Sequence, residues 1–139
     1  MIYLIGPYTS SSLAEHQLNI GRLYAYYLKL TKEHPGEPIV CYPLMTSGFE
    51  QVHTLHNHDW MALCKALIAW TMPDCYIAPG YERSTGSLDE IKYAEQLDLT
   101  ISYLPRIAHD EALALTYDLM LLQSRNQFAR LALRWLASD

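Results

Sequence analysis

Short apolar runs alternate with stretches of helical periodicity along the first three quarters of the chain. The apolar runs cover residues 1–5, 38–42, 74–78 and 99–104. The helical patterns cover residues 13–34, 59–72 and 87–97. Apolar runs without polar alternation are typical of strands that are covered on both faces, as in a parallel sheet. The order of these elements predicts βαβ units with right-handed crossovers, and thus an α/β domain with four or five mainly parallel strands.

The ends of several elements carry recognisable signals. Ser12 is followed three residues later by Glu15, which fits a capping box, so the first helix should begin near Leu13. Pro43 should close the second strand, because proline lacks the N–H that a strand pairing needs. Residues 44–58 have weak periodicity, and loops of this length are usually functional lids or poorly ordered segments.

The last part of the chain, residues 107–139, is helical by pattern and follows the α/β domain of residues 1–106. An apolar stripe runs along it through Phe128, Leu131, Ala132 and Trp135. We expect a helix or helical hairpin whose stripe either packs on the same domain or forms a dimer contact. The pattern alone does not separate these two interpretations.

The composition limits the class of protein. The chain has 139 residues, and 50% of them are hydrophobic, which is enough for one core. A formal net charge of -5 and a pI near 5.6 argue against binding nucleic-acid polymers, which requires a basic face. No apolar run approaches the roughly 20 residues of a membrane span, and the N-terminus lacks a leader pattern. We therefore expect a cytoplasmic protein that does not enter a membrane.

Cysteines and histidines give no indication of a metal site. Cys41, Cys64 and Cys75 lie in apolar runs without a C-x-x-C pair, as buried reduced thiols do. His53, His56 and His58 lie close together, but their spacing matches no standard zinc site and no cysteine lies nearby. We expect solvated or substrate-contacting imidazoles, and the protein should need neither a metal nor an organic cofactor.

The stretch from Pro79 to Glu90 concentrates the candidate chemistry. It lies between the third apolar run and a helical pattern, so it predicts a strand, a loop and a helix N-terminus. In an open α/β sheet such a junction binds ligands, because it presents free backbone N–H groups at the carboxyl end of a strand. The loop adds the hydroxyls of Ser84 and Ser87, the cation of Arg83 and the carboxylate of Glu90.

Three short motifs follow one another along the chain. Residues 2–8 read IYLIGPY, residues 79–81 read PGY, and residues 84–90 contain S-x-G-x-x-x-E. Their order and spacing resemble the nucleoside 2-deoxyribosyltransferase superfamily, which includes 2′-deoxynucleoside 5′-monophosphate N-hydrolases and small bacterial and phage proteins. The likeness covers residues 1 to about 104. It implies a flavodoxin-like three-layer fold and cleavage of the N-glycosidic bond of a nucleoside or nucleotide, by hydrolysis or by base exchange.

The resemblance also implies catalytic roles. Glu90 corresponds to the family nucleophile that attacks the anomeric carbon, and Tyr3 corresponds to a strand tyrosine beside that nucleophile. The aspartate expected in the family would fall near Ala66, which is not acidic. Asp59 lies on the same helical face, and it is one candidate for the proton donor. Asp74 is the other.

Substrate contacts are implied for the loops that carry the motifs. Ser84 falls where the transferases have a base-contacting carboxylate and the nucleotide hydrolases have a phosphate-contacting serine, which favours a phosphorylated small-molecule substrate. Family sites often borrow residues from a neighbouring subunit, so we expect a homodimer or a higher homo-oligomer. The candidate substrate-binding residues are Gly6, Tyr8, Gly80, Tyr81, Arg83, Ser84, Gly86 and Ser87.

The charges that develop during the reaction explain why these residue types would suit it. Breaking an N-glycosidic bond creates positive charge on the sugar and negative charge on the leaving base. A carboxylate beneath C1′ stabilises the first charge, either as a nucleophile or electrostatically. A proton donor with a raised pKa neutralises the second.

Ordinary explanations exist beside the catalytic ones. Ser87 and Glu90 also fit a capping box, in which Glu90 would only accept the Ser87 N–H. Tyr3 also fits a core aromatic residue whose hydroxyl is satisfied locally. Tyr8 and Tyr81 also fit residues that pack a loop. A different class of function remains open as well: a module that binds a nucleotide without chemistry and relays occupancy through the C-terminal helices.

Overall fold

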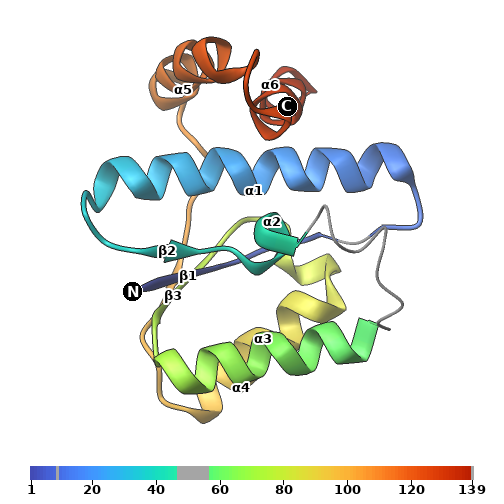
Figure 1. The fold of residues 1–139 in the computed structure, drawn as a ribbon, viewed down its shortest axis with the longest axis vertical. Helices are drawn as coiled ribbons and strands as arrows, with labels where there is room; N and C mark the ends of the chain where they lie inside the picture. The colour runs from blue at the N-terminus through green and yellow to red at the C-terminus, as the bar shows by residue number, and fades with distance from the viewer. Residues whose placement is uncertain (9, 47–56, 139) are drawn as a thin grey trace.

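Four parallel strands form one sheet, and helices cover both of its faces (Figure 1). The structure is a computed structural model that describes residues 1–8, 10–46 and 57–138. Its strands are β1 (Ile2–Ile5), β2 (Ile39–Val40), β3 (Asp74–Ile77) and β4 (Ile101–Tyr103), and their order in the sheet is β2-β1-β3-β4. The predicted α/β class with a parallel sheet is confirmed.

The helices form layers on the two sides of the sheet. On one side α1 (Leu13–Glu33) lies next to the sheet, and α5 (His109–Leu122) and α6 (Gln127–Ser138) lie beyond α1 (Figure 1). On the other side lie α3 (Asn57–Thr71) and α4 (Thr85–Gln96). The short helix α2 follows the edge strand β2 and spans Tyr42–Thr46.

Strand β1 divides its side chains between two cores. Ile2 and Leu4 belong to the core beneath α1, whereas Tyr3 and Ile5 belong to the core beneath α3 and α4. Because all four side chains are buried, an unbroken apolar run suits this central strand. Tyr3 is the one residue of the run that brings a polar group into the core.

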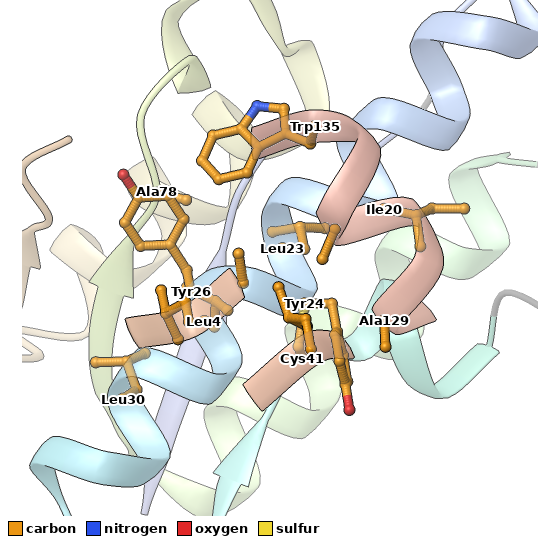
Figure 2. Close-up of a cluster of buried hydrophobic side chains, with 14 of the residues drawn as sticks. Leu4, Ile20, Leu23, Tyr24, Tyr26, Leu30, Cys41, Ala78, Ala129 and Trp135 are labelled. Carbon is orange, nitrogen blue, oxygen red and sulfur yellow. The ribbon is translucent and has the colours of Figure 1, made fainter. Parts of the chain in front are cut away.

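Helices α1 and α6 approach each other very closely. A Cβ atom at Gly21 of α1 would lie 2.2 Å from the carbonyl oxygen of Leu131, so only glycine permits this approach. Ala129, Ala132 and Trp135 of α6 are buried in one hydrophobic cluster with residues of α1. Figure 2 shows Ala129 and Trp135 in this cluster together with Ile20, Leu23 and Tyr26. The apolar stripe of the last helix therefore makes its contacts within the chain.

The capping signal at the start of α1 is confirmed in part. The Ser12 hydroxyl accepts a hydrogen bond from the Glu15 N–H (3.3 Å), and the helix begins at Leu13 as predicted. The reciprocal half of the box does not form, because the Glu15 carboxylate accepts from the Ser10 hydroxyl instead (3.0 Å). The Ser12 N–H donates to that same Ser10 hydroxyl oxygen (3.3 Å).

Other boundaries differ from the sequence prediction. β2 ends at Val40, and Pro43 lies inside α2 rather than closing a strand. Proline is tolerated in a first helical turn, where its missing N–H needs no partner. α4 begins at Thr85, two residues before the predicted start, because Ser84 is its N-cap. α3 begins at Asn57, again two residues early.

Candidate active site

A buried hydrogen bond joins two of the predicted site residues. The Tyr3 hydroxyl donates to the Glu90 carboxylate over 2.7 Å, although the two residues are 87 positions apart in the sequence. Tyr3 is 0% exposed and Glu90 is 8% exposed. The capping interpretation predicted for Glu90 is therefore wrong, because its carboxylate bonds to the central strand and not to the start of its own helix.

The local sequence explains how α4 presents this carboxylate. Ser84 caps the helix by accepting a hydrogen bond from the Ser87 N–H (3.2 Å), which uses the donor that a Ser87–Glu90 capping box would need. The buried face of α4 consists of Ser87, Glu90, Ile91 and Ala94, which follow the helical spacing of three and four residues. Glu90 thus occupies a position where the fold would normally place an apolar side chain.

Burial controls the electrostatics of the pair. Removal from water raises the pKa of Glu90 from 4.5 to about 7, although the Tyr3 hydrogen bond acts in the opposite direction and favours the ionised form. Asp89 raises this pKa further, and Lys65 lowers it. Burial, followed by the nearby Glu90 charge, raises the pKa of Tyr3 well above its usual 10. At neutral pH the phenol is therefore protonated, and the carboxyl group lies close to its titration midpoint.

Among the described residues, one cation affects the pKa of Glu90. It is Lys65 of α3, whose ammonium group pairs with Asp89 over 2.8 Å. The Cys64 thiol is a second hydrogen-bonding neighbour of the Tyr3 hydroxyl. Sequence reasoning assigned no role to Cys64, because a cysteine on an apolar helix face carries no signal beyond core packing.

The switch in strand order defines a crevice at the carboxyl edge of the sheet. β1 and β3 are neighbours, and the chain continues from them toward opposite edges of the sheet, so their carboxyl ends form a topological switch point. Pro7 follows β1 there, and the loop with Gly80, Arg83 and Ser84 follows β3. These four residues line one cavity of about 180 Å³.

This cavity has a mainly cationic and polar lining. Arg22 and Arg83 contribute guanidinium groups, Asn19 an amide and Trp135 of α6 an aromatic wall, while Glu15 adds one carboxylate. A smaller cavity of about 70 Å³ shares both arginines and Trp135 and is also lined by Arg106. Glu90 is not among the residues that line either cavity.

The two arginines differ in how they are held. Arg22 donates to the carbonyl oxygen of Pro79 (3.3 Å), and its guanidinium lies 5.7 Å from the centre of the Trp135 ring. Arg22 therefore ties α1 and α6 to the loop after β3. Among the residues that the structure describes, no carboxylate pairs with Arg83. Sequence analysis singled out Arg83 as a substrate contact and treated Arg22 as structural, because the place of Arg22 in the cavity depends on the packing of α1.

Two of the predicted glycines owe their identity to packing. A Cβ atom at Gly6 would lie 2.6 Å from the Leu23 side chain, and one at Gly80 would lie 2.5 Å from Arg22. Gly80 also has a φ of +92°, which favours glycine. Gly86 has more space, since its Cβ atom would make an ordinary contact of 3.5 Å with the Met61 sulfur.

The predicted aromatic contacts are occupied within the fold. Tyr8 is buried in the core on the α1 side, and its ring packs against His16 with 4.7 Å between ring centres. Tyr81 packs against Tyr103 with 5.2 Å between ring centres. Both rings thus have an aromatic neighbour within the chain, and their contact with a substrate stays a prediction. Ser87 is 2% exposed, and within the described part of the chain its hydroxyl has no hydrogen-bond partner.

The structure does not bring Asp74 to this site. Asp74 is the first residue of β3 and is exposed at the amino edge of the sheet, whereas the loop with Arg83 and Ser84 lies at the carboxyl edge. We therefore drop Asp74 as a proton donor. The Asp59 side chain lies outside the described residues, as do His53, His56 and the His58 side chain, so those predictions stay untested.

Neither a metal cluster nor a membrane span is found in the described chain. No group of three histidine, cysteine, aspartate or glutamate residues in the described ranges is placed to hold a metal ion. No helix in those ranges combines the length and the apolar character that crossing a bilayer requires. Comparison of the chain with family models, curated proteins and solved structures gave no match.

Proposed function

We propose that this protein cleaves the N-glycosidic bond of a small nucleoside or nucleotide, with Glu90 as the carboxylate that attacks or stabilises the anomeric carbon. The observation that carries the proposal is the buried hydrogen bond from Tyr3 to Glu90. A resemblance of the motifs in residues 2–8 and 79–90 to nucleoside 2-deoxyribosyltransferases supports the same assignment.

The energetic cost of this pair favours a catalytic role over a structural one. A carboxyl group in a core loses hydration, and within the described part of the chain the side-chain donor that reaches Glu90 is a neutral phenol. An apolar pair of the same volume would stabilise the domain better. Residues with strongly shifted pKa values are candidates for catalysis, because enzymes use burial to tune acids and bases.

The phenol would hold the carboxylate ready for reaction. By donating to one oxygen, Tyr3 favours the ionised form of Glu90 and fixes its rotamer. Attack on C1′ needs the ionised form, so the rate of base release should rise with pH through about 7. Replacing Tyr3 by phenylalanine should move this rise in rate to higher pH, because the hydrogen bond that favours ionised Glu90 is lost.

The surrounding fold suits an anionic substrate. The strand order β2-β1-β3-β4 is compatible with a flavodoxin-like sheet, in which ligands bind at the switch point beyond the strand ends. Arg83 and Ser84 line the cavity at that point and would hold a 5′-phosphate, because guanidinium groups bind phosphate oxygens bidentately. Asp59 remains our candidate for the acid that protonates the leaving base.

The test is chromatography of reaction mixtures after incubation with ribo- and deoxyribonucleosides and their 5′-monophosphates. We expect release of a free base, and exchange with an added base would identify a transferase. Glu90→Gln keeps an acceptor for the Tyr3 hydroxyl and should lower the rate by about a thousandfold or more. Glu95→Gln makes the same change of charge on the exposed face of α4 and should keep full activity. Full activity in Glu90→Gln would refute the proposal.

One observation favours a second candidate, a nucleotide-binding module without chemistry. Trp135 of α6 lines the same cavity as Arg83, so a ligand in the cavity would contact the C-terminal helical part of the chain. This alternative predicts that one compound of the panel raises the melting temperature while none is consumed. Consumption of any compound with loss of activity in Glu90→Gln would exclude it.

A further inference from the structure

Helix α5 lies in the outer layer of the molecule (Figure 1), and it exposes a continuous apolar face. Leu113, Tyr117, Met120 and Leu121 are between 56% and 66% exposed, and they follow the i, i+4, i+7, i+8 spacing of one helical face. We call these four residues the α5 outer stripe. A helix of this position in a monomer would normally present charged residues to water.

The opposite face of α5 already has its partners. Leu115 and Leu119 are buried in the core on the α1 side. Asp118 pairs with Lys32 of α1, and Glu111 pairs with Lys29. The helix is held to α1 by this separate set of apolar and charged contacts. Packing of α5 on its own domain therefore does not require the α5 outer stripe.

Opposite charges flank the stripe. Asp110 lies at its amino-terminal end and Arg125 follows its carboxyl-terminal end, and both residues are exposed. Tyr117 lies midway between these two charges in the sequence. No charged residue interrupts the stripe, since Asp118 points toward Lys32 of α1.

We propose that the α5 outer stripe is the contact through which two copies of this chain form an antiparallel dimer, with the twofold axis near Tyr117. In this arrangement Asp110 of each copy faces Arg125 of the other, and the apolar residues pack between the two charge pairs. A twofold contact must be self-complementary, and a face that is acidic at one end and basic at the other meets that requirement only in the antiparallel direction. Antiparallel helices also place opposite dipole ends together.

This interface differs from the dimer contact considered from the sequence, which involved the stripe of α6. That stripe packs against α1 within the chain. One helix on each side buries less than the roughly 800 Å² per partner of a standard interface, so the dimer should dissociate upon dilution. The proposal does not depend on the proposed glycosidase activity.

Light scattering coupled to gel filtration, from low to high micromolar protein, tests the contact. Wild type should shift from monomer to dimer, and Tyr117→Glu should weaken the dimer by about a hundredfold, because it brings two carboxylates together at the axis. Trp70→Glu replaces an apolar residue that is 85% exposed on α3, and it should leave the equilibrium unchanged. A monomer at every concentration, or a dimer that Tyr117→Glu leaves intact, would overturn the proposal.

A charge exchange tests the antiparallel direction separately. Asp110→Arg and Arg125→Asp should each weaken the dimer by about tenfold, and the double variant should restore it. Failure of the double variant to restore the dimer, while each single variant still weakens it, would rule out the pairing of Asp110 with Arg125. Tyr117→Cys should form a disulfide-linked dimer on oxidation, because the axis brings the two copies of this residue together. The absence of that crosslink in a dimeric sample would likewise overturn the proposed axis.

Discussion

The two sides of the sheet differ in how their buried polar side chains are compensated. One side is covered by α1, and the other by α3 and α4. On the α1 side of the sheet, the buried Lys29 pairs with two carboxylates that reach solvent, and the buried Asn19 donates to the Tyr8 carbonyl oxygen. Beneath α4, the Glu90 carboxyl group relies on the neutral Tyr3 phenol. The first arrangement compensates the polar groups that it buries, whereas the second leaves a carboxyl group close to its titration midpoint.

The two sides of the sheet therefore differ in what they contribute to the stability of the domain. The α1 side of the sheet gains from close approach, as the contact between α1 and α6 at Gly21 demonstrates. The core beneath α4 accepts a destabilising carboxyl group beside the central strand β1. Such a cost to stability would be expected at a site tuned for chemistry, as we propose for Glu90.

The largest expected effect concerns the α1 face, and it would test how tightly that face is packed. Gly21→Val places side-chain atoms against the Leu131 carbonyl oxygen and should lower the free energy of unfolding by about 4 kcal/mol. Gly86→Ala is the matched control, since its Cβ atom has space and alanine favours the helix. Urea titration measures both, and equal stability of the Gly21→Val variant and wild type would contradict the close approach.

The second-largest expected effect is the pH dependence that Glu90 gives to the stability of the domain. The pKa of Glu90 is raised on folding from 4.5 to about 7, so the folded state binds the proton more tightly than the unfolded state, and stability falls as pH rises across this range. Relative to wild type, Glu90→Gln should gain about 3 kcal/mol between pH values below and above that range. Denaturant midpoints of the two proteins at several pH values measure this gain. A constant difference would mean that Glu90 titrates normally.

A smaller effect is expected from the donor of the pair. Tyr3→Phe should cost about 1 kcal/mol where Glu90 is protonated and about 2 kcal/mol where it is ionised, because bonds to charged groups are stronger. The additional loss at high pH should vanish in the Glu90→Gln background. A double-mutant cycle measured below and above pH 7 reports this coupling directly. The same coupling at both pH values would show that the phenol does not respond to the charge.

The smallest effect returns to the α1 face. Lys29→Met removes the ion pairs to Glu33 and Glu111 but keeps the length of the aliphatic chain, and both carboxylates remain exposed enough to be hydrated. We expect a loss below about 1 kcal/mol, with little dependence on pH near neutrality. Thermal melts in low and high salt would check this value. A loss as large as that of Gly21→Val would contradict the view that packing dominates this face.

Several features of the fold were accessible from local sequence signals. The apolar runs located all four strands, because strands buried on both faces need no polar alternation. Ser12 correctly located the start of α1. The predicted helix start at Ser87 was wrong. Ser84 has an equivalent hydroxyl three residues earlier, and it is Ser84 that caps α4.

The candidate site was only partly accessible in this way. Glu90 and Tyr3 were singled out, but their contact depends on the parallel pairing of β1 with β3 and on the seating of α4 over β1. Gly6, Gly80 and Tyr8 were expected to contact substrate; the structure shows a packing partner for each, and Gly80 also lines the cavity, so these contacts stay predictions. These partners belong to α1, so the sequence of the loops alone does not predict them.

The sequence by itself determined the order of strands and helices, the parallel class of the sheet and the loop that carries the polar residues. These features follow from apolar periodicity, proline positions and caps, which act over a few neighbouring residues. The tertiary structure alone decided that Glu90 is buried against Tyr3, that Arg22 joins Arg83 at one cavity, and that α6 covers α1. These contacts join distant parts of the chain, and burial changes the chemistry of a side chain only after the elements have packed.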